Sequence, residues 1–121
     1  AASAIPDLIR ALNHQDSYVR WSSLGARGNM GEKAAPAIPT LIQTLNDPVS
    51  DVRSSAVWAL KSISTKAPKL VTEALAVVFD AVLQSYPNNL NGLVKSLYAT
   101  STYRFFRQSD GSVVARDVAV D

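Results

Sequence analysis

Few side chains in this 121-residue sequence are of the types that carry acid–base or metal chemistry. The single histidine, His14, lies near Asp16, but no nucleophile pattern accompanies the pair. One histidine and no cysteine argue against a zinc site. The carboxylates Glu32, Glu73 and Asp80 are isolated and show no pairing that general acid–base catalysis would use. We therefore predict no catalytic residue, no metal site and no cofactor, and a protein that is not an enzyme.

The charge and glycine patterns argue against phosphate and nucleic-acid ligands. Segment GARGNMG, residues 25–31, lacks both the Lys-Ser/Thr ending of a P-loop and a preceding strand. Twelve basic and ten acidic side chains give a net charge of +2, which does not by itself indicate nucleic acid or an anionic membrane. Basic residues in the second half are too scattered among acidic ones to form a nucleic-acid groove. They include Lys61, Lys66, Lys69, Arg104 and Arg107.

Targeting and membrane signals are not visible in the sequence. No apolar run reaches membrane-spanning length. The segment AASAIPDLIRAL, residues 1–12, has no basic stretch before an apolar run, as a signal peptide would. The lack of cysteine fits a reducing compartment. We expect a cytoplasmic protein that does not bind a membrane.

Large aromatic side chains are the strongest candidates for a binding role. On a helical wheel at about 100° per residue, Val52 and Leu60 share one side and Trp58 points to the other. Trp21 projects from the same face one turn away, with Tyr18 beside it. Either these residues form an aromatic and polar binding surface, or each indole packs over a neighbouring unit and seals the stack. The predicted partner-binding residues are Tyr18, Trp21, Ser22, Ser54, Ser55, Trp58 and Lys61.

An internal repeat of 33 residues predicts the elements that position these side chains. The two copies align without a gap in both apolar and helix-breaking positions. Equivalent segments include Ala4-Ile5-Pro6 and Ala37-Ile38-Pro39, Leu8-Ile9 and Leu41-Ile42, Leu12-Asn13 and Leu45-Asn46, and Val19-Arg20 and Val52-Arg53.

Each unit is expected to contain two helices. The first begins at Pro6 or Pro39, because proline is accepted in the first helical turn. A polar turn, NHQDS or NDPVS, separates it from the second helix. Two such helices cannot bury their apolar faces alone, so stacked copies predict an all-α fold, an α-solenoid. The second helices should direct Val19, Ser23, Ala26 and Met30, and Val52, Ala56, Ala59, Leu60 and Ile63, toward the core.

The segment AIPTLIQTLNDPVSDVRSSAVWAL, residues 37–60, resembles a HEAT repeat of the short type found in phycobilisome-lyase-like repeat proteins. It has the family's order of proline, Leu-Ile, Leu, an Asp-containing turn, Val-Arg, small residues and Ala-Leu. The first unit departs from this order, since Arg27 stands at the position of Leu60 and His14-Gln15 at that of Asp47-Pro48. The resemblance covers about residues 4–64.

This resemblance implies a non-catalytic scaffold that binds a protein partner on the concave side, which the second helices line. It also implies an alternative, a subunit of a bilin lyase or isomerase that attaches or detaches a tetrapyrrole on a phycobiliprotein. A HEAT-like nucleic-acid binder is a third alternative. Asp47 with Arg53, and Asp16 with Arg20, are expected to form a hydrogen-bond ladder that braces adjacent turns, unless one of the arginines contacts a ligand.

The remaining residues predict a degenerate third unit and a tail. Residues 67–87 should form one longer helix, with Val71, Leu75, Val78 and Val82 inward. Residues 90–106 can form its partner, capped by Asn89, with Leu90, Val94, Leu97 and Tyr98 inward. Asp110-Gly111 between YRFFRQ and VVARDVAV is instead typical of a β-hairpin, and a disordered tail or linker fits equally.

We predict a solenoid domain over residues 1–107 and a tail, linker or hairpin strand over residues 108–121. The repeats should span about residues 4–31, 37–64 and 68–107. The chain begins within what resembles an inter-repeat segment, so we expect a piece of a longer array. Uncovered apolar surface at the ends of such a piece would allow self-association through the terminal repeats.

Overall fold

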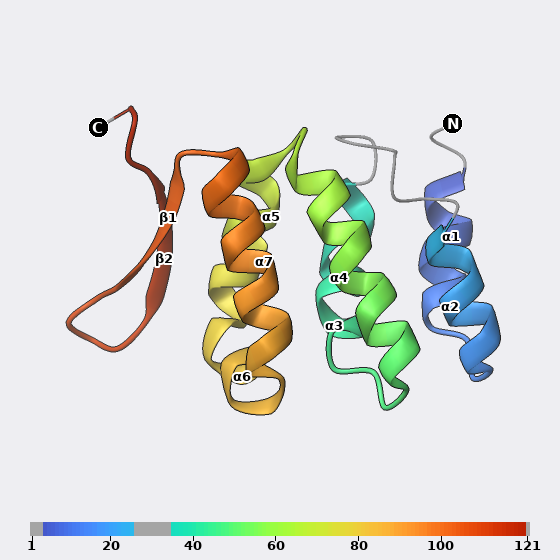
Figure 1. The fold of residues 1–121 in the computed structure, drawn as a ribbon. Coiled ribbons are helices and arrows are strands. Elements are labelled where there is room, and N and C mark those ends of the chain that lie inside the picture. The colour runs from blue at the N-terminus through green and yellow to red at the C-terminus, as the bar shows by residue number, and fades with distance from the viewer. Residues whose placement is uncertain (1–3, 26–34, 121) are drawn as a thin grey trace.

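The computed structural model describes residues 4–25 and 35–120. These residues form seven helices followed by a two-stranded antiparallel hairpin (Figure 1). The elements are α1 (Ala4–Leu12), α2 (Ser17–Gly25), α3 (Ile38–Thr44), α4 (Ser50–Ser64), α5 (Pro68–Val77), α6 (Phe79–Ser85), α7 (Pro87–Thr100), β1 (Tyr103–Arg107) and β2 (Val113–Asp117). The predicted core positions Ala26 and Met30 lie outside the described residues.

The helices form two layers, as the repeat predicts. In Figure 1, α2, α4 and α7 make one layer, and α1, α3, α5 and α6 make the other, with the hairpin at one end. Helix α4 contacts α2 and α7 within its own layer, and α3 and α5 in the other. Proline occupies the first turn of α3, α5 and α7, where its missing N–H leaves no hydrogen bond unmade. The predicted all-α solenoid with an irregular or hairpin tail is confirmed.

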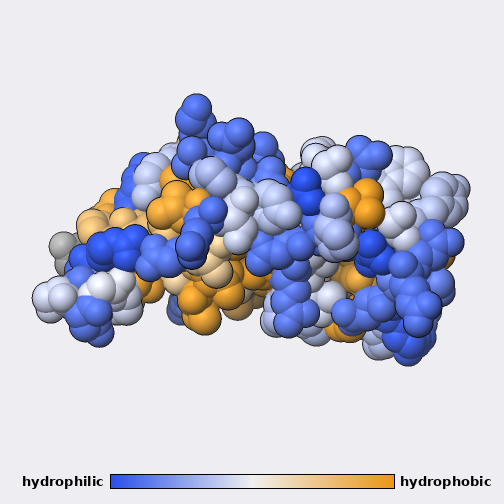
Figure 2. Space-filling model, turned by 90° about the horizontal axis from the view of Figure 1, so that it is seen from below, coloured by the Kyte–Doolittle hydropathy of each residue, from blue (hydrophilic) through white to orange (hydrophobic). Residues whose placement is uncertain are grey.

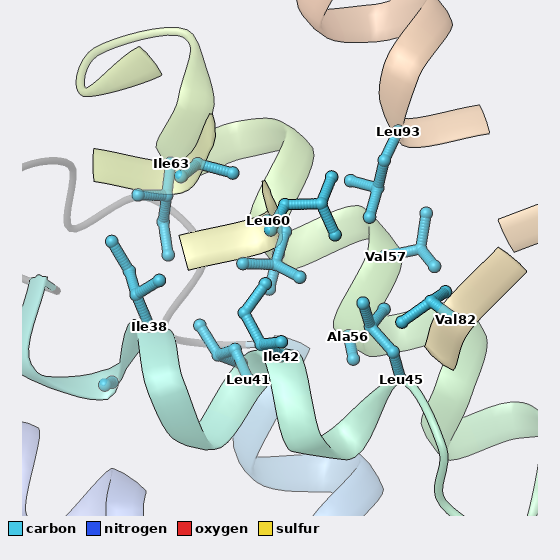
Figure 3. Packing of buried hydrophobic residues seen from close by; sticks show 14 of the residues in the cluster. Ile38, Leu41, Ile42, Leu45, Ala56, Val57, Leu60, Ile63, Val82 and Leu93 are labelled. Carbon is cyan, nitrogen blue, oxygen red and sulfur yellow. The ribbon is translucent and has the colours of Figure 1, made fainter. Parts of the chain in front are cut away.

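One continuous hydrophobic core joins the layers. All five core positions predicted on α4 are buried, from Val52 to Ile63. Val57, which the sequence left unassigned, is also buried and lies between Leu93 of α7 and Val82 of α6 (Figure 3). It joins the second unit to the third. Burial of each large aliphatic side chain contributes about 1.5–3 kcal/mol to folding, so this core holds the stack together.

The third unit differs from the expected single pair. The predicted long helix is interrupted at Val78, whose backbone angles of φ −110° and ψ 14° end α5 and begin α6. Two consecutive β-branched residues, Val77 and Val78, weaken the helix at this point. The interruption sets Phe79 against Phe105 of the hairpin, with ring centroids 5.1 Å apart. Helix α7 begins at Pro87 with Tyr86 as its cap, so the expected cap at Asn89 is wrong.

The tail is a hairpin, so the helix predicted over residues 90–106 is wrong from Ser101 onward. Helix α7 ends at Thr100, its C-cap Ser101 is extended (φ −148°, ψ 171°), and the aromatic-rich segment that follows becomes β1. Gly111 adopts a left-handed φ of 91° in the turn, as the Asp-Gly pair predicts. The predicted boundary between residues 107 and 108 falls between the two paired strands.

Candidate functional site: the face of the second helices

The predicted partner-binding residues lie on two neighbouring helices of one layer. Three belong to α2 and four to α4, and these helices are in contact (Figure 1). The α2 residues are Tyr18, Trp21 and Ser22, and the α4 residues are Ser54, Ser55, Trp58 and Lys61.

The aromatic side chains of this set reach solvent. Tyr18 is 68% exposed, Trp21 45% and Trp58 51%. An indole that sealed the stack would be buried, whereas both tryptophans are about half exposed and remain available for contact in this chain. Exposed aromatic side chains that gather on one face, unlike ones that are scattered singly, indicate a contact surface. The wheel therefore placed the two tryptophans on the correct side of their helices.

A groove of about 280 Å³ lies where the N-terminal ends of α2 and α4 meet. Tyr18 and Trp21 form one wall, with ring centroids 6.0 Å apart and ring planes at 41°. Val49 supplies aliphatic surface above the buried Val52, and Asp51 supplies a carboxylate. Aromatic and aliphatic walls with a single acidic group suit an apolar side chain or a basic side chain with a long aliphatic stem.

A second groove, of about 260 Å³, lies between α4 and the turn into α7. Its lining is polar and includes Ser50, Ser54 and Asn88. The Arg53 guanidinium lies 4.2 Å from the centroid of the Tyr86 ring. Tyr86 is the residue between α6 and α7. The sequence indicated neither this groove nor the Arg53–Tyr86 contact, because the third unit lacks the turn motif of the other two.

The remaining predicted residues lie at different depths. Ser22 and Ser54 are exposed, whereas Ser55 and Lys61 are half-buried. Lys61 lies on the α7 side of α4, since a Cβ added at Gly92 would be 3.7 Å from its Nζ atom. The structure thus places Tyr18 and Trp21 together on one groove and Ser54 on the other, with Lys61 beside α7.

The turns below this face are braced by a buried ion pair between repeats. Arg20 donates to both carboxylate oxygens of Asp47, from Nε at 2.6 Å and from Nη2 at 3.1 Å. The Arg20 and Asp47 side chains are only 12% and 8% exposed. Arg20 also donates to the backbone carbonyls of His14 and Gln15. This pairing fixes the position of α2 relative to α4, and so the walls of the first groove.

A ladder of hydrogen bonds between turns is present, but its pairing differs from the expected one, since the Arg20 side chain reaches Asp47 and not Asp16. Arg53 donates to the backbone carbonyl of Asp47 at 2.6 Å, and not to its carboxylate. The Asp47 carboxylate instead accepts from the Val49 N–H and from the preceding repeat's arginine. Asp16 accepts from the Tyr18 N–H. Asp16 therefore caps α2, Asp47 braces the turn before α4, and both arginines bind turn carbonyls.

Other site types have no geometric support in the described part of the chain. No group of three or more His, Cys, Asp or Glu side chains there is arranged to hold a metal ion. None of the helices described has the length and apolar character that crossing a membrane requires.

Stacked antiparallel helix pairs that share one core and are tied together through their turns define an α-helical repeat protein of the solenoid class. The chain belongs to the HEAT-repeat family, because a family model described as HEAT repeats matches residues 5–86. The match ends before α7, so the last helix and the hairpin lie beyond it. A search of curated proteins gives no significant match. HEAT repeats generally act as scaffolds for protein interactions.

Proposed function

We propose that this chain is a non-catalytic scaffold that binds a protein partner through the layer of α2, α4 and α7. The observation that carries the proposal is the exposure of Tyr18, Trp21 and Trp58 on adjacent helices of that layer. Tyrosine and tryptophan bury a large area with few rotatable bonds, which makes them effective interface anchors. The resemblance to HEAT repeats predicts that this layer is the concave side.

The first groove indicates the chemistry of the partner's anchoring residue. A side chain that enters this groove would contact the aromatic rings of Tyr18 and Trp21 and the aliphatic side chain of Val49. Asp51 at the rim favours a partner with an amine or guanidinium at that point. The buried Arg20–Asp47 pair holds the groove walls in place before binding, so less ordering accompanies the contact.

The test compares partner capture by the wild-type chain and by matched surface variants. Trp21→Ser and Trp58→Ser remove the exposed indoles, while Leu83→Ser removes an exposed apolar side chain from α6 in the other layer. A partner captured by the wild-type chain should be lost with the double tryptophan variant and retained with Leu83→Ser. Circular dichroism shows whether each variant remains helical. Equal capture by all three folded proteins would exclude this face.

Among the residues that the structure describes, no contact favours either of the two alternative functions. A bilin lyase or isomerase would produce a coloured adduct when the protein is incubated with bilin and apo-phycobiliprotein. A nucleic-acid binder would show binding with steep salt dependence. A cytoplasmic location and self-association through terminal repeats remain predictions from the sequence.

A further inference from the structure

The hairpin presents a strand edge that the described chain does not pair. Gln108 N–H donates to the Ser112 carbonyl, and Val118 N–H donates to the Thr102 carbonyl. In an antiparallel pair every second residue forms the backbone hydrogen bonds, and the register pairs Arg104 with Arg116 and Phe106 with Val114. The even-numbered residues therefore form the backbone hydrogen bonds between β1 and β2. The peptide groups of Val113 and Ala115, and the N–H of Asp117, point outward along the free edge of β2.

The corresponding edge of β1 is occupied. The Phe105 N–H donates to the Tyr98 hydroxyl of α7 at 3.1 Å, and the Tyr103 N–H donates to the Ser101 hydroxyl. The edge of β2 has no such cover in the described residues. An unpaired edge presents a row of free N–H and C=O groups, which can serve as a template for another strand.

The two faces of the hairpin that meet at this edge carry different side chains. The outward face of the hairpin carries Arg116, which faces Arg104 directly across the strands and lies 5.2 Å from the centroid of the Phe106 ring. Arg104 is engaged with carbonyls at the C-terminal end of α7, whereas Arg116 forms no ion pair among the described residues. Like charges directly opposite each other are unfavourable, so a carboxylate beside Arg116 would be stabilising.

On its inward side the hairpin packs against a helix that carries exposed aliphatic side chains. Strand β2 lies against α5, on which Leu70 is 40% exposed and Val77 86%. Seven residues apart, these two share one side of the helix, next to half-buried Ala74 and away from buried Thr72 and Ala76. Figure 2 shows hydrophobic surface gathered toward the hairpin end of the molecule, while the α1 and α2 end is mostly hydrophilic.

We propose that the free edge of β2 binds an extended acidic segment of a partner protein as a third strand. Alternate residues of that segment would be apolar and cover Leu70 and Val77. The residues between them would be Asp or Glu and lie beside Arg116. Main-chain hydrogen bonds to Val113 and Ala115 would supply affinity, and the alternation of side chains would supply specificity. This surface is separate from the aromatic face of α2 and α4.

A second copy of the chain is a less suitable occupant. Antiparallel pairing of β2 with its own copy, centred on Ala115, would place Arg116 opposite Val114. No carboxylate would then approach either Arg116, and the outward face would carry four arginines in place of two. An acidic strand relieves the charge that a self-pair increases.

The experiment uses the ¹⁵N-labelled chain and a blocked heptapeptide that alternates valine with glutamate. We expect its addition to shift and protect the amides of Val113, Ala115 and Asp117, while the amide of Trp58 is unaffected. Arg116→Glu should weaken binding at least tenfold and restore it for a peptide that alternates valine with lysine. Trp21→Ser should leave binding unchanged, which separates this proposal from the proposed function of the aromatic face.

Ala115→Pro is the sharpest variant, because the Ala115 N–H forms no bond within the hairpin. The hairpin should persist, as reported by the amides of Phe106 and Val114, while peptide binding is lost. Undiminished binding by a folded Ala115→Pro variant would overturn the proposal. So would the absence of shifts at millimolar peptide, or dimerisation of the chain alone with protection of the same amides.

Discussion

Arg20 shows how one side chain can serve a whole repeat. Its guanidinium joins the Asp47 carboxylate of the next unit to two carbonyls of its own turn. The sequence indicated the arginine and both aspartates as turn residues. It did not indicate which aspartate Arg20 would reach, because the partner lies 27 residues away and only the stacking of the repeats brings it near.

We expect Arg20→Met to lower the free energy of unfolding by about 2–4 kcal/mol, because it leaves the Asp47 carboxylate buried without its cation. The matched control is Arg10→Met. Arg10 pairs with Asp7 on the surface, and both side chains are more than 60% exposed. Its loss should change stability by less than about 0.5 kcal/mol. Urea denaturation measures both, and equal effects would contradict a structural role for the buried pair.

The ion pair between Asp80 and Arg107 makes hairpin docking sensitive to acid. The hydrogen bond from Arg107 lowers the pKa of Asp80 below its ordinary value of 3.8. Because the folded pKa lies below the unfolded one, the stabilisation is complete above the ordinary value and is lost as the pH falls through the lowered pKa. The protection of the β1 amides, measured relative to their intrinsic exchange rate at each pH, should therefore fall at low pH. Asp80→Asn should remove this step, and an identical acid response in that variant would count against the pair.

At the level of elements, the hairpin is positioned by aromatic packing and by one hydroxyl. Phe105 packs between Phe79 of α6 and Tyr98 of α7. The Tyr98 hydroxyl also accepts from the Phe105 N–H. The sequence showed the Asp-Gly turn, but residues 103–106 also continued the helical pattern of α7. The contacts with α6 and α7 decided between the two, since a single isolated hairpin is marginal in water.

Tyr98→Phe should accelerate exchange of the Phe105 amide about fivefold, because one hydrogen bond of roughly 1 kcal/mol is lost while the ring remains. Tyr103→Phe is the control, since no hydrogen bond to the Tyr103 hydroxyl is present in the described residues. Hydrogen exchange followed by NMR gives both rates. If the two variants exchange alike, the Tyr98 hydroxyl does not anchor the strand.

At the scale of the whole molecule, stability should decrease from the centre of the stack toward α1. Helix α4 packs against four other helices, whereas α1 packs against α2 and α3. In a solenoid each unit depends on its neighbours, so local opening is easiest where neighbours are few. We expect the amides of α4 to exchange most slowly and those of α1 fastest, as measured by hydrogen–deuterium exchange with mass spectrometry. Equal protection of both helices would indicate all-or-none unfolding.

The sequence by itself determined the features that depend on local periodicity. The 33-residue repeat and the spacing of Val52, Leu60 and Ile63 predicted helix pairs, their buried sides and the outward direction of Trp21 and Trp58. These follow from the 3.6-residue period of the helix, which is a property of neighbouring residues.

Only the tertiary structure decided the features that depend on contacts between distant segments. They include the partner of Arg20, the break at Val78 that sets Phe79 on Phe105, the choice of a hairpin after Thr100 and the open edge of β2. For the helix break and the hairpin, local helix and strand preferences were nearly balanced, and burial of side chains far apart in the chain outweighed them. The partner of Arg20 and the free edge of β2 follow from how the elements then stack.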